Sequence, residues 1–127
     1  MAGRLRNEHI LVTGGGRGIG AAIVEKCISE GAEVSFIDLE EEEAKSLLKK
    51  LDQDKKLIFV KGNVCSVEDL KRLCDSAREK FGSITGLVNN AGRNSYADPV
   101  TMTEQQWEDV FNVDLKAAWL TAREALP

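Results

Sequence analysis

The chain has 127 residues, 43% of them hydrophobic and 30% charged, and its 17 basic and 21 acidic side chains give a formal net charge of -4. These values are typical of one globular domain and exclude collagen-like and disordered classes. The modest negative charge, with no cluster of basic residues, argues against nucleic acid or a membrane surface as partner. No apolar stretch approaches the roughly 20 residues that span a bilayer, and the N-terminus lacks the apolar core of a secretory signal. We therefore expect a cytoplasmic protein.

The cysteines and the histidine limit the chemistry that the chain can support. Cys27, Cys65 and Cys74 are odd in number and lack C-x-x-C spacing, so we expect neither a disulfide framework nor a thiolate metal site. We interpret them as small hydrophobic core residues of a reducing compartment. His9 is the only histidine, which excludes a Ser-His-Asp triad and a histidine metal cluster. No metal site is predicted.

The first half of the chain alternates strand and helix patterns. Residues 9–13 are a short apolar strand candidate, and the segment after them has an approximate helical periodicity that ends at Gly31. Residues 33–39 predict a second strand, and residues 40–51 a helix with glutamates in its first turn and lysines in its last, which suits the helix dipole. The side chains expected to point inward are Ile19, Ile23, Cys27 and Ile28 in the first helix and Ala44, Leu47, Leu48 and Leu51 in the second.

The second half continues the alternation. Residues 56–60 predict a third strand, and Ser66 and Asp69 have capping-box spacing before a helix that stops at Gly82. Residues 84–92 predict a fourth strand, which a polar loop connects to a last helix capped by Thr103 and Gln106. The apolar residues of these two helices are Leu70, Leu73, Cys74, Ala77 and Phe81, then Trp107, Val110, Phe111, Ala118, Trp119 and Ala122.

Strands that alternate with helices of this length predict a parallel sheet with right-handed crossovers. The expected fold class is therefore α/β, a doubly wound parallel sheet. The chain shows no internal repeat, low-complexity tract or linker, so we expect a single domain over residues 1–127.

Five glycines lie within residues 14–20, between the first strand and the first helix. Missing side chains let a pyrophosphate approach the backbone, and the helix N-terminus offers unpaired N–H groups and a positive dipole end. We expect Gly14 to make the tight turn, Gly18 to allow the close approach and Gly20 to let the helix pack on the strand. The pattern G-x-G-x-x-A also fits residues 16–21. A P-loop is excluded, because no glycine of the loop is followed by Lys and then Ser or Thr.

A carboxylate stands at the end of the second strand. Asp38 follows Gly20 by 18 residues, close to the spacing of the carboxylate that binds the adenosine ribose of a dinucleotide. Such a group accepts hydrogen bonds from the ribose hydroxyls and repels a 2′-phosphate, so Asp38 predicts NAD over NADP. Arg17 favours the opposite choice, because a loop arginine could pair with a 2′-phosphate. Asp38 could also cap the second helix while it binds the ribose.

Four motifs occur in one order: TGGGRGIG over 13–20, Asp38, GNV over 62–64 and NNAG over 89–92. Together they resemble the short-chain dehydrogenase/reductase family over essentially the whole chain. The resemblance implies a Rossmann-type sheet truncated after the fourth strand and its helix, that is, an incomplete NAD(P)-binding domain. Asn63 stands where many members have Asp. The cofactor-binding residues that the resemblance implies are Gly14, Arg17, Gly18, Ile19, Gly20, Asp38, Asn63, Val64, Asn90, Ala91 and Gly92.

The resemblance also implies a residue near the reaction. Family members usually carry in the last helix an Asn that holds a water of the proton relay, and the family count of seven residues from Trp107 reaches Asp114. Asn112 lies two residues earlier, on another face of the helix. Asp114 is therefore the catalytic candidate, as an acceptor for that water, and a surface acid is the alternative.

The catalytic Ser, Tyr and Lys of the family are missing from the pattern. The only tyrosine is Tyr96, and the residue four positions on is Val100, so no Tyr-x-x-x-Lys is present. We therefore expect the N-terminal portion of an NAD-dependent dehydrogenase acting on an alcohol or carbonyl, inactive by itself. The alternatives are a short nucleotide-binding or regulatory product and an inactive remnant. An open edge at the fourth strand and an exposed last helix make a homo-oligomer possible.

Overall fold

A parallel sheet of four strands forms the centre of the protein. The computed structural model describes residues 3–51 and 55–127. The strand order is β3-β2-β1-β4, which agrees with the order of the first four strands of a Rossmann sheet. Ile10 of β1 lies opposite Val34 of β2 and Gly86 of β4, so β1 is paired on both sides. The strands are β1 His9–Thr13, β2 Glu33–Asp38, β3 Leu57–Lys61 and β4 Gly86–Val88.

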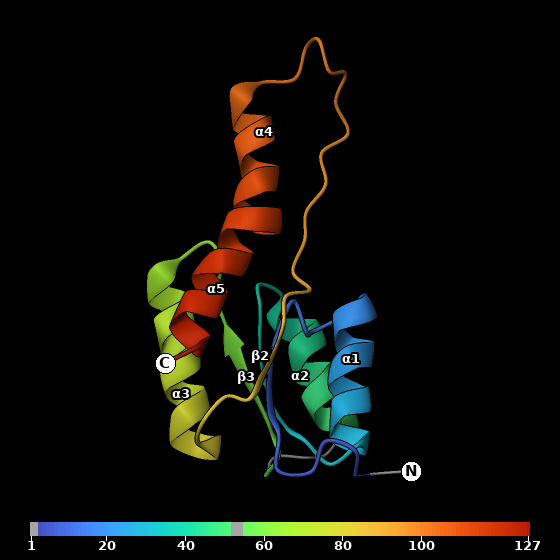
Figure 1. Cartoon of the computed structure of the whole chain (residues 1–127). Coiled ribbons are helices and arrows are strands. Elements are labelled where there is room, and N and C mark those ends of the chain that lie inside the picture. Colours follow the sequence, from blue (N-terminus) through green and yellow to red (C-terminus); the bar gives the residue numbers. More distant parts are fainter. Residues whose placement is uncertain (1–2, 52–54) are drawn as a thin grey trace.

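Helices cover both faces of this sheet (Figure 1), as the alternating pattern predicted. Helices α1 (Gly18–Ser29) and α2 (Glu41–Leu51) lie on one face, and α3 (Val67–Phe81) and α5 (Ala117–Ala125) lie on the other. Each face has its own core because alternate residues of a strand point to opposite sides. Val12 and Phe36 belong to the α1 and α2 core, whereas Leu11 and Ile37 belong to the α3 and α5 core.

The inward face of α1 differs from the predicted one. Ile19 was expected to face the core but is 76% exposed, while Val24 is fully buried. Helix α1 begins at Gly18, and Gly20 is turned onto the glycine loop, where an added Cβ would overlap the carbonyl oxygen of Gly14. Once Gly20 faces inward, the residues four and seven positions later, Val24 and Cys27, must follow it. Ile19 is left at the surface.

The predicted caps of α3 and of the last helix are present. The Ser66 hydroxyl accepts a hydrogen bond from the Asp69 N–H at 3.2 Å, and the C-cap residue of α3 is Gly82, whose φ is 79°. Thr103 and Gln106 form a complete capping box. These local signals explain why both helices start where the sequence indicated.

The fourth strand is shorter than predicted. A strand was expected over residues 84–92, but β4 covers only Gly86–Val88. The N–H groups of Asn90 and Ala91 each donate to the Thr13 hydroxyl at 3.0 Å and do not join the ladder with β1. The side-chain acceptor thus draws this segment out of the sheet.

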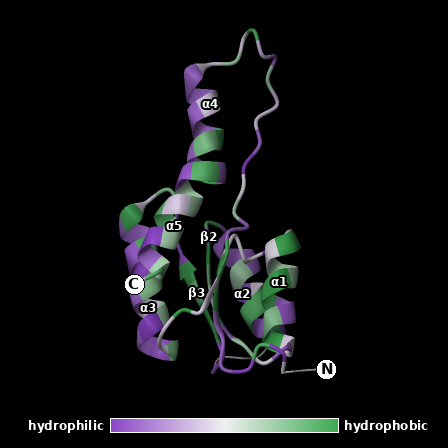
Figure 2. Ribbon diagram, viewed as in Figure 1, coloured by the Kyte–Doolittle hydropathy of each residue, from purple (hydrophilic) through white to green (hydrophobic). Residues whose placement is uncertain are grey.

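The last helix is not continuous. It consists of α4 (Glu104–Phe111), a π-helical turn η1 (Asn112–Lys116) and α5. Helix α4 and the loop before it project from the sheet, and α4 buries none of its residues although it carries hydrophobic bands (Figure 2). In the ranges 3–51 and 55–127, no helix is long and apolar enough to cross a membrane.

Candidate functional site

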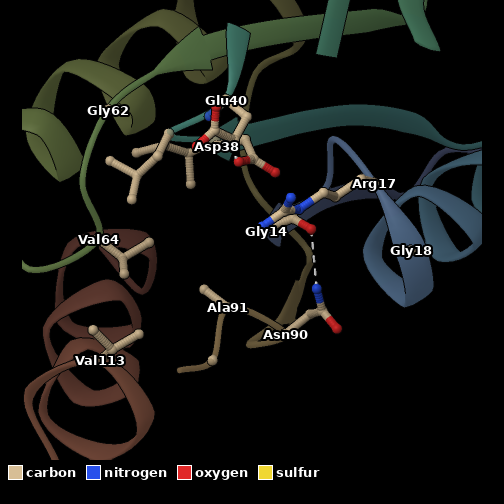
Figure 3. Close-up of a pocket in the computed structure, with 13 residues that line it drawn as sticks. Gly14, Arg17, Gly18, Asp38, Glu40, Gly62, Val64, Asn90, Ala91 and Val113 are labelled. Atoms are coloured by element: carbon tan, nitrogen blue, oxygen red, sulfur yellow. Dashed lines mark hydrogen bonds between the residues drawn. The ribbon is translucent and has the colours of Figure 1, made fainter. Parts of the chain in front are cut away.

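A cavity of about 380 Å³ opens beyond the carboxyl ends of the strands (Figure 3). It lies where the chain direction across the sheet reverses, between β1 and β4, which is the usual place for a ligand in an open α/β sheet. Its volume is within the usual range for small-molecule sites. The wall is built by the glycine loop, the end of β2, the segment after β3, the segment after β4 and η1. The lining residues are Gly14, Arg17, Gly18, Ile37, Asp38, Leu39, Glu40, Gly62, Val64, Asn90, Ala91, Gly92 and Val113.

Gly14, Gly18 and Gly20 of the glycine loop are each explained by a different feature of the structure. Gly14 has a φ of 66°, and its N–H donates to the Ile37 carbonyl at 2.8 Å, which ties the turn to β2. Gly18 has a φ of 57°, and a Cβ there would have no neighbour within 4 Å, so its backbone borders open space. Gly20 packs α1 onto the turn at Gly14. The tight turn predicted at Gly14 and the packing role predicted for Gly20 agree with this geometry, and the approach of a pyrophosphate at Gly18 stays a prediction.

The N-terminus of α1 faces the same cavity. Its N-cap residue, Arg17, is extended and provides no side-chain acceptor, and the first turn contains no acidic residue. The first N–H groups of the helix therefore retain their positive potential. A pyrophosphate is the kind of group that such a terminus binds.

Both carboxylate oxygens of Asp38 are held by backbone donors. Oδ2 accepts from the Gly16 N–H at 2.8 Å, and Oδ1 accepts from the Glu40 N–H at 3.0 Å. Each oxygen keeps lone-pair capacity for a further donor. Arg17 lines the same cavity and supplies its only cation among the described residues.

Val64 and Asn63 occupy different positions. Val64 is 9% exposed and lines the cavity on the same side as Val113 (Figure 3). The Asn63 side chain is turned to its own loop, where Oδ1 accepts from the Cys65 N–H at 2.8 Å. The backbone N–H of Asn63 donates to the Asp69 carboxylate, and this hydrogen bond is the main reason why the pKa of Asp69 is lowered. Asn63 thus shapes the loop and does not line the cavity.

The segment after β4 is fastened to the glycine loop. The Asn90 side chain donates to the Gly14 carbonyl at 3.0 Å (Figure 3), and Ala91 and Gly92 continue the cavity wall. Thr13, which is 2% exposed, anchors the same segment by accepting from two of its N–H groups. Sequence reasoning did not single out Thr13, although a hydroxyl at the end of a strand directly before a glycine loop was a usable signal.

Asp114 lies at the edge of the cavity, in the π-helical turn. Its Oδ1 accepts from the Arg93 N–H at 2.7 Å, and a Cβ built on Gly92 would lie 3.6 Å from that oxygen. The residue is exposed. Single π turns inside α-helices often occur at functional sites. Asn112 borders a separate hollow with Cys65 and Lys116.

Besides Asn63 and Asp114, two more predicted site residues lie outside the lining. Ile19 points to solvent, and Gly20 is covered by the turn that it packs against. The lining residues that were not among the predicted site residues are Ile37, Leu39, Glu40, Gly62 and Val113. The first four become neighbours of the cavity because the strands are parallel and in register, and Val113 reaches it through the π-helical turn η1.

The cysteines take no part in the cavity wall. Cys27 and Cys74 are buried and Cys65 is partly buried, and all three are free. Burial raises the pKa of each thiol, which favours the uncharged, weakly nucleophilic form. Within the described part of the chain, no three His, Cys, Asp or Glu side chains are grouped so that they could hold a metal ion.

The similarity to known proteins extends beyond the four motifs. The sequence pattern of the family described as short chain dehydrogenase matches residues 8–127. A protein named probable galactose dehydrogenase, from Rhizobium meliloti, is 34% identical over 125 residues, which are 97% of this chain and 49% of that protein. The 2-(S)-hydroxypropyl-CoM dehydrogenase 3 of Xanthobacter autotrophicus is 35% identical over 127 residues, 99% of this chain and 50% of that protein.

Solved structures give the same result for the fold. A short-chain dehydrogenase/reductase from Brucella melitensis, described as a glucose/ribitol dehydrogenase, matches with a TM-score of 0.95 and 27% identity, over 100% of this chain and 54% of that one. The chain spans about half the length of the relatives that it matches. The resemblance inferred from the motifs and the Rossmann-type fold are thus confirmed. The chain belongs to the short-chain dehydrogenase family.

Proposed function

We propose that this chain is the NAD-binding portion of an oxidoreductase that interconverts an alcohol and a carbonyl compound. One observation carries the proposal: Gly18 and the open end of α1 border the same cavity as the carboxylate of Asp38. That donor set suits a dinucleotide, with its pyrophosphate at the helix terminus and its ribose at the carboxylate. In this proposal Ile19, Gly20 and Asn63 shape the loops, and the lining residues contact the cofactor.

NAD is the cofactor that the charges favour. Asp38 and Glu40 both line the cavity at the end of β2, and two carboxylates repel a 2′-phosphate. Arg17 lies in the same wall, and its positive charge attracts a 2′-phosphate. We give the two carboxylates the greater weight because Asp38 is fixed by two N–H groups, whereas Arg17 is exposed and its side chain caps nothing.

Nicotinamide, when bound, supplies the site for hydride transfer to or from the substrate carbon. The residues of this chain hold and orient the cofactor. Asp114 fixes the segment after Gly92 through the Arg93 N–H and has a second carboxylate oxygen that would accept a hydrogen bond from a water. The sequence has no Tyr-x-x-x-Lys, so the proposed activity belongs to a protein that also contains such residues.

The relatives support a hydroxyl-bearing substrate. Their names are those of dehydrogenases of galactose and of 2-(S)-hydroxypropyl-CoM. We propose the class of alcohol or carbonyl compound and no individual substrate. The alternative is a nucleotide-binding module without catalysis.

The proposal includes self-association and a cytoplasmic location. Trp107, Phe111, Leu115 and Trp119 are 43–64% exposed and recur every four residues along α4, η1 and α5. Sedimentation velocity over a range of concentrations would detect an oligomer. The location rests on the odd number of cysteines and their spacing.

NADH and NADPH titrations, followed by cofactor fluorescence, test the function. We expect saturable NADH binding that is tighter than NADPH binding. The substitution Asp38→Ala should weaken NADH binding by about 1.5–3 kcal/mol, the value of hydrogen bonds to a charged group. Glu42→Ala, on the exposed side of α2 outside the cavity lining, is the charge-matched control and should bind like the parent chain. A folded chain that binds neither nucleotide would contradict the proposed function.

A further inference from the structure

Backbone conformation does not explain why positions 15 and 16 of the loop are glycine. Gly15 and Gly16 do not have a positive φ, so an L-residue could adopt their backbone geometry. A side chain at either position would nevertheless require a neighbour to move. A Cβ on Gly15 would lie 2.7 Å from Phe36 Cβ, and a Cβ on Gly16 would lie 2.8 Å from Asp38 Oδ2.

The two close approaches differ in what would have to move. Phe36 is fully buried in the α1 and α2 core, so its Cβ has little freedom. Asp38 Oδ2 is the end of a partly buried side chain that can rotate. A methyl group at position 16 would therefore be accommodated by turning the carboxylate, at little cost to folding.

That rotation would break a specific contact. Asp38 Oδ2 accepts from the Gly16 N–H at 2.8 Å, while Oδ1 is held by the Glu40 N–H. The two donors belong to different segments, and together they fix the plane of the carboxylate at the rim of the cavity. Loss of the Gly16 contact would free one oxygen and move it away from its present position.

We propose that Gly16 is a positioning residue for cofactor specificity: its missing side chain lets the loop N–H hold the Asp38 carboxylate where it accepts ribose hydroxyls and opposes a 2′-phosphate. This inference rests on the proposed function and adds a second determinant of the NAD preference. In this proposal the glycine loop acts at two parts of the cofactor. Gly18 borders the phosphates, and Gly16 positions the Asp38 carboxylate that binds the ribose.

The test is a double-mutant cycle of Gly16→Ala and Asp38→Ala, in which NADH and NADPH dissociation constants are both measured. We expect Gly16→Ala to weaken NADH binding by about threefold to tenfold, the value of one hydrogen bond, and to lower the preference for NADH over NADPH by a similar factor. In the Asp38→Ala background the same substitution should have no effect on either constant. Thermal unfolding of each variant confirms that it is folded.

Gly15→Ala is the control within the same loop. It should lower the thermal unfolding temperature through Phe36 and leave the ratio of the two dissociation constants unchanged. An equal change of that ratio in Gly15→Ala, or an unchanged ratio in Gly16→Ala, would overturn the inference while leaving the proposed function in place. A parent chain that binds neither nucleotide would overturn both.

Discussion

The sheet with its flanking helices and the projecting segment α4–η1 use similar sequence patterns with opposite results. In α3 the apolar residues Leu70, Leu73, Cys74 and Ala77 recur at helical spacing and are buried, and Leu73 is fully so. In α4 and η1 the apolar residues at four-residue spacing are exposed, with Leu115 at 64%. The spacing of apolar residues along a helix therefore determines which of them share a face, while tertiary packing determines whether that face is covered.

Truncation of one leucine in each region gives the largest expected contrast. Leu73→Ala removes a side chain from the core between α3 and the sheet and should lower the free energy of unfolding by about 2–5 kcal/mol. Leu115→Ala removes an exposed side chain and should change it by less than about 0.5 kcal/mol. Urea unfolding followed by circular dichroism measures both. Equal losses of unfolding free energy in the two variants would mean that the Leu115 side chain is buried in solution.

A smaller effect is expected at the edge of the site, where Thr13 joins β1 to the segment after β4. Thr13→Val keeps the shape but leaves the N–H groups of Asn90 and Ala91 without their acceptor, which should cost about 1–3 kcal/mol. Thr13→Ser retains the hydroxyl and is the matched control. NADH binding should weaken in the valine variant alone, and equal behaviour of the two variants would refute the anchoring role.

The smallest effect concerns Glu30, at the opposite end of α1. Hydrogen bonding from Arg4 lowers the pKa of Glu30 to about 2, with a smaller contribution from Lys26. A folded pKa below the unfolded value stabilises the protein at neutral pH, and this contribution is lost as the pH falls from about 4.5 towards 2. Glu30→Gln should therefore lose less stability than the parent chain over that pH range. Acid unfolding curves of the parent chain and of Glu30→Gln that superimpose would contradict a stabilising ion pair between Arg4 and Glu30.

Much of the fold and of the site followed from local signals. Strand and helix alternation, the caps at Ser66 and Thr103, and the spacing from the glycine loop to Asp38 are all short-range features, and the structure agrees with them.

Features that depend on tertiary contacts could not be predicted. The buried face of α1 is set by Gly20 against the turn, and the end of β4 is set by the hydroxyl of Thr13. The π turn at Asn112–Lys116 and the cavity residue Val113 depend on how the last helix meets the sheet. No periodicity in the sequence encodes these contacts.

Site-resolved binding tests the central claim most directly. In a ¹H–¹⁵N NMR titration of the chain with NAD⁺, the amide signals of Gly14, Gly18 and Gly92 should shift until saturation, because these residues line the cavity. Those of Gly31 and Gly82, at the amino ends of the strands, should stay in place. Signals that remain unchanged at saturating NAD⁺, or shifts that are as large at Gly31 and Gly82, would contradict a dinucleotide site in this cavity.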